Sequence, residues 1–66
     1  MVVNGQSLSL QVLPEATLVS LLEYFRLSPQ RVAVEINGEI LPREEFFKRK
    51  LQEEDNIEII HFAGGG

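Results

Sequence analysis

The stretch that decides the fold is the C-terminal run Asn56–Gly66, NIEIIHFAGGG. In an extended strand, successive side chains point to opposite sides. One side therefore carries Ile57, Ile59 and His61, and the other carries Glu58, Ile60 and Phe62. The length of this run predicts a central strand of a β-sheet. If its first side covers a helix, the second side is an open face.

Two Asn-Gly pairs, Asn4-Gly5 and Asn37-Gly38, predict β-hairpins because both residues tolerate the positive φ angles of a type I′ turn. Residues expected to face the core around the first turn are Met1, Val3, Leu8, Leu10 and Val12. The last three alternate with polar residues, which predicts that the strand after the turn continues to Val12. Around the second turn, the core side carries Val32, Val34 and Ile36, and the open side carries Ala33 and Glu35.

One main helix is predicted between the hairpins. Thr17 is a good N-cap, and the apolar residues that follow have the i, i+3, i+4, i+7 spacing of a helical stripe. This stripe consists of Leu18, Leu21, Leu22 and Phe25. Ser28-Pro29 is expected to end the helix, since a residue before proline avoids the α conformation. A short second helix is expected after Pro42, pinned to the core by Phe46, Phe47 and Leu51.

The predicted fold is therefore α+β, with a mixed sheet of four to five strands, one main helix on one face and a short second helix. A chain of 66 residues is expected to form one domain. We expect residues 1–63 to make up this domain and residues 64–66 to form a flexible glycine tail, because glycine has no side chain to pack.

The composition disfavours several functions. The net charge of −4 opposes binding to nucleic acid and favours a basic protein partner. The chain has no cysteine and one histidine, His61, so we expect no metal site. No serine has a visible base and acid beside it, and the carboxylate runs Glu44-Glu45 and Glu53-Glu54-Asp55 are expected to be solvated. A long apolar run and a charged leader are both absent, so the expected setting is the cytoplasm, away from membranes.

Without an active site in the body of the chain, the open face and the tail become the candidate functional features. Ile60 and Phe62 lie beside acidic residues and could form a partner-docking patch. The residues expected in this patch are Ala33, Glu35, Glu58, Ile60 and Phe62. Three glycines can extend roughly 10 Å and can enter a narrow channel, since they have no Cβ. Composition alone favours a frayed end over a functional tail.

Several motifs resemble those of the thiamine-biosynthesis sulfur carrier proteins, the ThiS family, which has the ubiquitin-like β-grasp fold. The resemblance covers essentially the whole chain. Its most specific parts are Asn37-Gly38-Glu39 followed by Pro42-Arg43, and the glycines that come directly after the last strand. It also includes the helix segment ATLVSLLEYF.

The resemblance implies a protein cosubstrate, not an enzyme. A ThiF-type adenylating enzyme would use ATP and magnesium to adenylate the carboxylate of Gly66, while Gly64 and Gly65 thread its active site. Sulfur originating from a cysteine desulfurase would convert the adenylate to a thiocarboxylate for a ThiG-type thiazole synthase. The carrier would bind no cofactor itself and would be a monomer when free. Three alternatives stay open: a carrier like the small subunit of molybdopterin synthase, a protein modifier, and a β-grasp interaction module.

Overall fold

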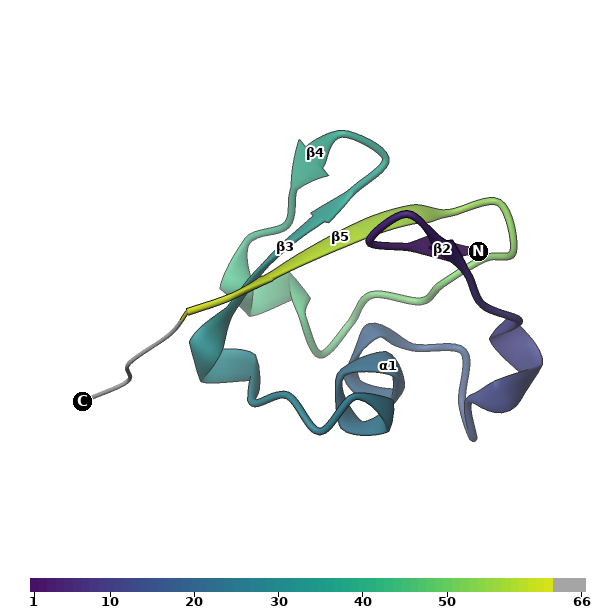
Figure 1. Cartoon of the computed structure of the whole chain (residues 1–66). Helices are drawn as coiled ribbons and strands as arrows, with labels where there is room; N and C mark the ends of the chain where they lie inside the picture. Colours follow the sequence, from purple (N-terminus) through teal and green to yellow (C-terminus); the bar gives the residue numbers. More distant parts are fainter. Residues whose placement is uncertain (63–66) are drawn as a thin grey trace.

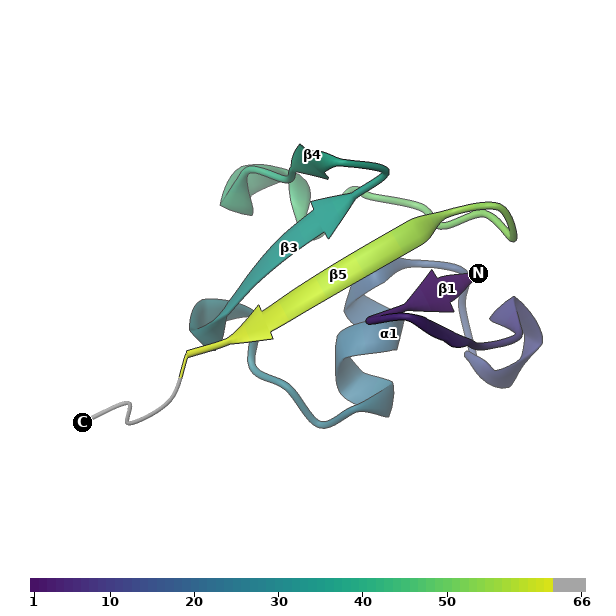
Figure 2. The ribbon, with the colours of Figure 1, turned by 45° about the horizontal axis from the view of Figure 1, so that its top comes forward.

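The structure is a computed structural model that describes residues 1–62. Within these residues, one five-stranded sheet, in the order β2-β1-β5-β3-β4, covers a single α-helix (Figure 1). The strands are β1 (Val2–Val3), β2 (Gln6–Ser7), β3 (Val32–Ile36), β4 (Glu39–Ile40) and β5 (Asn56–His61). The helix is α1 (Leu18–Tyr24), and single 3-10 turns occur at Leu10–Val12, Pro29–Arg31 and Arg43–Glu45. Strand β5 pairs parallel to β1 and antiparallel to β3, so its predicted central position is confirmed (Figure 2).

Both predicted hairpin turns are confirmed. Asn4 and Gly5 have φ angles of 49° and 82°, and Asn37 and Gly38 have φ angles of 54° and 86°. These paired positive values are those of type I′ turns, whose twist matches that of the strands they join. The second turn sets the register of β3 and β4, in which Ile36 faces Glu39.

The core lies between α1 and the face of the sheet that covers it. Thr17 caps the helix, as predicted, because its Oγ1 accepts a hydrogen bond of 3.1 Å from the Ser20 N–H. The residues of the core are Met1, Val3, Leu13, Leu18, Leu21, Leu22, Val32, Val34, Ile36, Phe46, Leu51, Ile57 and Ile59. Helical and strand periodicity therefore identified most of the buried residues from sequence. None of the helices within residues 1–62 has the length and apolar character needed to span a membrane.

The predicted strand from Leu8 to Val12 is wrong. Strand β2 ends at Ser7, and the chain then forms the 3-10 turn Leu10–Val12. The Ser9 Oγ accepts a hydrogen bond of 3.2 Å from the Gln11 N–H. Such local side-chain bonds compete with strand pairing. Leu8 and Leu10 still pack partly against the core, whereas Val12 is exposed.

The main helix ends earlier than predicted. It stops at Tyr24, well before Ser28-Pro29. Arg26 has a positive φ of 59°, the Leu27 N–H donates to the Leu22 carbonyl at 2.8 Å, and the Arg26 N–H donates to the Glu23 carbonyl at 3.0 Å. These bonds form a Schellman motif, which reverses the chain direction. Phe25 consequently lies at the end of the helix and is half-exposed instead of buried.

Two further expectations about side-chain burial are wrong. Phe46 and Leu51 are buried, but Phe47 is 71% exposed because the segment after Pro42 is a short 3-10 turn rather than a longer helix. Asp55 is only 4% exposed, although its carboxylate run was expected to be solvated. Its Oδ1 accepts a hydrogen bond from the Asn37 side chain at 3.0 Å, and its Oδ2 accepts one from the Gln52 N–H at 2.9 Å.

Candidate functional site

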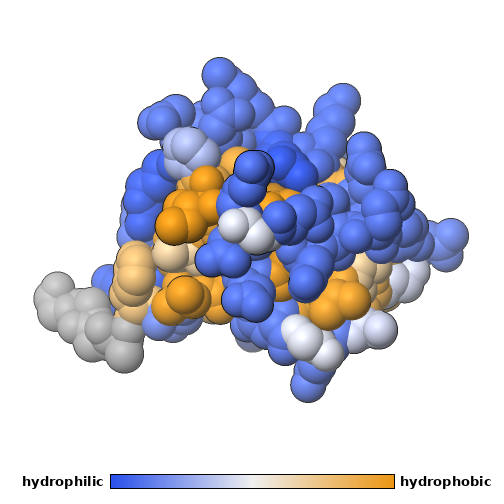
Figure 3. Space-filling view, turned by 90° about the horizontal axis from the view of Figure 1, so that it is seen from above, coloured by the Kyte–Doolittle hydropathy of each residue, from blue (hydrophilic) through white to orange (hydrophobic). Residues whose placement is uncertain are grey.

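The candidate site is the face of the sheet opposite α1, which we call the open face. Figure 3 views the molecule from this side and shows apolar surface bordered by hydrophilic surface. Ile60 and Phe62 are 61% and 48% exposed, and Glu58, two residues before Ile60 on the same side of β5, is also exposed. Ala33 pairs with Ile60 across β3 and β5, and Glu35 pairs with Glu58. The structure thus brings the five residues of the expected patch together, while their role in docking stays a prediction.

Ile40 belongs to the same face, although the sequence analysis did not include it. It is 78% exposed and pairs with Glu35 across β3 and β4. A shallow hollow of about 80 Å³ lies between the three strands. It is lined by Ala33, Val34, Glu35, Ile40, Glu58 and Ile60. The position of Ile40 can be predicted from sequence, because a two-residue turn at Asn37-Gly38 places Ile40 opposite Glu35.

The open face also carries an unusual pairing of charges. Glu35 and Glu58 are direct cross-strand partners, and like charges in this arrangement destabilise a sheet. Among the ion pairs formed within residues 1–62, neither carboxylate takes part. The face therefore combines exposed aliphatic and aromatic groups with negative charge, which suits a surface with apolar and basic groups.

The end of β5 lies at one edge of this face. The Phe62 N–H donates a hydrogen bond of 2.8 Å to the Arg31 carbonyl, which continues the pairing with β3 by one residue. The chain continues from Phe62 into the predicted tail. Ala63, Gly64, Gly65 and Gly66 lie outside the described residues, so the domain boundary at residue 63 and the roles given to the glycines stay predictions.

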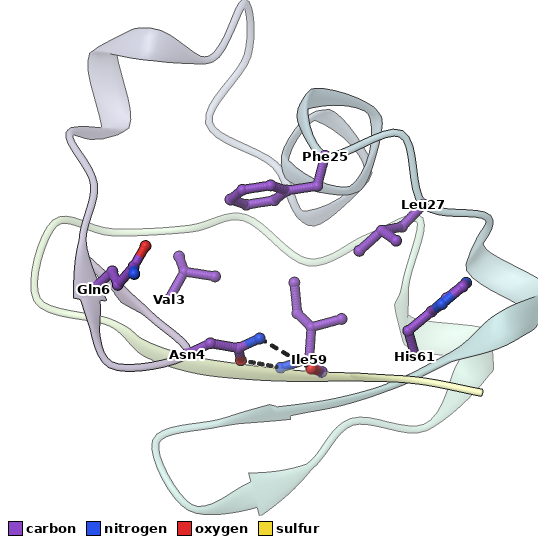
Figure 4. Close-up of a pocket in the computed structure, with 7 residues that line it drawn as sticks. All are labelled: Val3, Asn4, Gln6, Phe25, Leu27, Ile59 and His61. Carbon is purple, nitrogen blue, oxygen red and sulfur yellow. Dashed lines mark hydrogen bonds between the residues drawn. The ribbon is translucent and has the colours of Figure 1, made fainter. Parts of the chain in front are cut away.

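A groove of about 390 Å³ lies on the other side of β5, between the sheet and the end of α1 (Figure 4). Its walls are Val3, Asn4, Gln6, Phe25, Leu27, Ile59 and His61. The Asn4 side chain accepts a hydrogen bond from the Ile59 N–H at 2.7 Å and donates one to the Ile59 carbonyl at 3.1 Å (Figure 4). Among the described residues that line the groove, His61 has the only ionisable side chain, so these residues offer no paired acid and base.

The part of the chain that the structure describes contains no cluster of three His, Cys, Asp or Glu side chains placed to hold a metal ion. Every buried side-chain nitrogen or oxygen within residues 1–62 has a hydrogen-bond partner. The buried polar groups of this part of the chain are therefore used by the fold.

Comparison with known proteins gives consistent matches. The model of the ThiS family matches residues 2–66. The sulfur carrier protein ThiS of Bacillus subtilis is 42% identical over 50 residues, which are 76% of this chain and 76% of that protein. A thiazole synthase of Magnetococcus marinus is 44% identical over 50 residues, and these cover 76% of this chain but only 15% of that longer protein.

The fold matches in the same way. A crystal structure of the thiamine biosynthesis protein ThiS from Geobacter metallireducens superposes with a TM-score of 0.76 and 32% sequence identity. The match covers 98% of this chain and 96% of that one. Agreement in sequence, in fold and across nearly the full length confirms the predicted β-grasp arrangement and the predicted family. This chain belongs to the ThiS family, the sulfur carrier proteins of thiamine biosynthesis, which are carriers and not enzymes.

Proposed function

We propose that the carboxylate of Gly66 is the group that carries sulfur. A ThiF-type enzyme would transfer AMP from MgATP to this carboxylate and release pyrophosphate. A free carboxylate is a poor electrophile, and the mixed anhydride with AMP supplies the leaving group. The observation that supports this proposal best is the position of the open face, which adjoins the end of β5 at Phe62, the residue from which the chain continues toward the glycines.

The sulfur step needs groups that this chain lacks, because it contains no cysteine. In the proposal, the terminal sulfur of a persulfide, loaded by a cysteine desulfurase, attacks the acyl-adenylate and displaces AMP. A second thiol then cleaves the resulting acyl disulfide, so that the thiol is oxidised and the Gly66 thiocarboxylate leaves. This chain contributes the docking surface and the carboxylate, and the partners contribute the catalytic groups.

We infer that the sulfur acceptor is a thiazole synthase. The support is the Magnetococcus marinus protein named thiazole synthase, in which a stretch similar to this chain is part of a longer polypeptide. A carrier and its acceptor benefit from being joined, because the linker raises the effective concentration of one for the other. This observation favours thiazole formation over a molybdopterin-type acceptor.

Intact-mass measurement tests the chemistry. The chain is incubated with a ThiF-type enzyme, MgATP, a cysteine desulfurase and cysteine, and we expect a mass increase equal to the exchange of one oxygen for one sulfur. A chain lacking Gly66 is expected to fold normally and to show no increase. An unchanged mass with a demonstrably active enzyme would contradict the proposal, and attachment to lysine side chains would support the protein-modifier alternative.

A matched pair of variants tests the docking role of the open face. Ile60→Asp places a charge in the centre of the patch, and Phe47→Asp makes the same kind of change at an exposed residue outside it. Full burial of an isoleucine contributes about 1.5–3 kcal/mol, so covering the exposed 61% of Ile60 is worth about 1–2 kcal/mol. We expect the Kd for the ThiF-type enzyme to rise about tenfold for Ile60→Asp. Equal effects of the two substitutions would place the interface elsewhere.

A further inference from the structure

The end of β5 is supported on one side only. Strand β1 pairs with β5 at Asn56 and Ile57, and the Asn4 side chain extends this support to Ile59. Beyond Ile59, the backbone bonds of β5 are made to the other neighbour, β3 and the residue before it. The last of them joins the Phe62 N–H to the Arg31 carbonyl. The position of Phe62, where the described part of the chain ends, therefore depends on how firmly residues 29–32 are held.

Arg43 holds this segment from the opposite edge. Its Nη2 donates a hydrogen bond of 3.1 Å to the Val32 carbonyl, and its Nη1 donates to the Pro29 carbonyl. Carbonyls alternate in direction along a strand, so Arg31 points its carbonyl at β5 while Val32 points its carbonyl away from β5. The guanidinium thus binds carbonyls on both sides of Arg31, the residue to which Phe62 is bonded.

Arg43 takes the place that a longer β4 would occupy. The last backbone bond on that edge of β3 runs from the Leu41 N–H to the Val34 carbonyl, at 2.9 Å. Two residues earlier, the Val32 carbonyl accepts a hydrogen bond from the Arg43 guanidinium instead of from a backbone N–H. The side chain is itself held in place, because its guanidinium lies 5.7 Å from the centre of the Phe46 ring, which is buried in the core.

We propose that Arg43 is a positioning residue for sulfur carriage: by fixing residues 29–32 it holds Phe62, from which the chain continues toward Gly66. The proposal rests on the proposed function, because it assumes that the residues beyond Phe62 enter a partner. An arginine suits the role because its planar fork presents several donors in fixed directions, so that one side chain can bridge two carbonyls. A lysine offers a single ammonium group, which matches only one of them well.

Amide hydrogen exchange, followed by NMR on the free chain, tests without any partner whether Arg43 holds residues 29–32 and Phe62 in place. The variants are Arg43→Gln, Arg43→Lys and the control Arg49→Gln, which removes an arginine that contacts Asp55 and the Lys50 carbonyl instead. We expect exchange of the Phe62 N–H to accelerate about tenfold in Arg43→Gln, since a charge-assisted hydrogen bond is lost. Exchange of the Ile59 N–H, bonded to Asn4, should stay unchanged.

Three outcomes would overturn the proposal: an unchanged rate at Phe62, equal acceleration at Phe62 and Ile59, or the same effect in Arg49→Gln. Should Arg43→Gln fail to fold, Arg43→Lys decides in the same way, because it keeps the charge and should still accelerate exchange at Phe62 alone.

The consequence for adenylation is a separate measurement, with the unfolding free energies of the variants measured alongside. At an equal folded fraction, a loosely held Phe62 must be ordered on binding, so Arg43→Gln should raise the KM of the adenylating enzyme for this chain about tenfold, with kcat nearly unchanged. An unchanged KM would contradict the positioning role. Failure of the unmodified chain to be adenylated would instead contradict the proposed function. The exchange data would still show whether Arg43 holds Phe62 in place.

Discussion

Replacing Glu58 by glutamine should change fold stability and partner binding in opposite directions. Glu58 lies directly opposite Glu35, and a pair of like charges in this position costs about 0.2–1 kcal/mol. Removing one of them is expected to raise the free energy of unfolding by about 0.5 kcal/mol. For a domain of this size, that gain corresponds to an increase in Tm of about 2–4 °C. Urea and thermal unfolding, followed by circular dichroism, measure both quantities.

Partner binding should weaken in the same variant. Charges of this kind act mainly on the association rate and on its dependence on salt. We expect Glu58→Gln to slow association with the ThiF-type enzyme about threefold at low salt. The difference should shrink in 1 M salt, where the Debye length falls to about 3 Å. Stopped-flow fluorescence at two salt concentrations measures these rates.

The matched control is Glu23→Gln, which removes the same charge from α1, on the other side of the sheet. It separates the local effect from the general effect of lowering a net charge of −4. The reasoning would be refuted if Glu58→Gln destabilised the free chain, or if both variants slowed association equally. A variant that is more stable yet binds more slowly cannot owe its defect to unfolding, which makes this test sharper than a disruptive substitution.

Three other substitutions give distinct expected results. Asp55→Ala should lower the free energy of unfolding in urea by about 2 kcal/mol, because the Asn37 amide and the Gln52 N–H lose their acceptor; a loss below about 0.5 kcal/mol would contradict this. Gly38→Ala should lower the free energy of unfolding in urea by about 1–2 kcal/mol. The φ of 86° is the sole cause, since no atom lies within 4 Å of an added Cβ. Ile40→Asp should weaken partner binding as Ile60→Asp does while changing stability by less than about 0.5 kcal/mol, and unaffected binding would remove Ile40 from the interface.

The features that could be predicted from sequence are those set by short-range rules. The turn at Asn37-Gly38 needs only two residues that tolerate positive φ. The two sides of β5 follow from alternation, which correctly separated buried Ile57 and Ile59 from exposed Ile60. The grouping of residues on the open face then follows from strand pairing. The same pairing rule, applied across the turn at Asn37-Gly38, also places Ile40 on this face.

The failures involve residues whose environment depends on distant parts of the chain. The sequence predicts that Asp55 is solvated, but its Oδ1 accepts a hydrogen bond from the side chain of Asn37, which lies 18 residues earlier. The exposure of Phe47 depends on how a short turn orients two adjacent aromatic residues, and sequence periodicity is uninformative over so few residues. In the sequence, Arg43 stands out only as part of the Pro42-Arg43 motif, because nothing local shows that its guanidinium reaches the carbonyls of Pro29 and Val32.

The register of β5 links the fold to the proposed function. A shift of one residue would exchange the two sides of the strand, so that Glu58 and Ile60 would enter the core and Ile59 would face solvent. The short strand β1 pairs with only two residues of β5 and could not prevent such a shift by itself. Asn4 adds two hydrogen bonds to the backbone of Ile59, and these are lost after a shift of one residue, because the N–H and C=O groups of adjacent residues point to opposite sides of the strand. The same contacts that keep Ile57 and Ile59 in the core therefore keep Glu58 and Ile60 on the open face, which is the proposed docking surface.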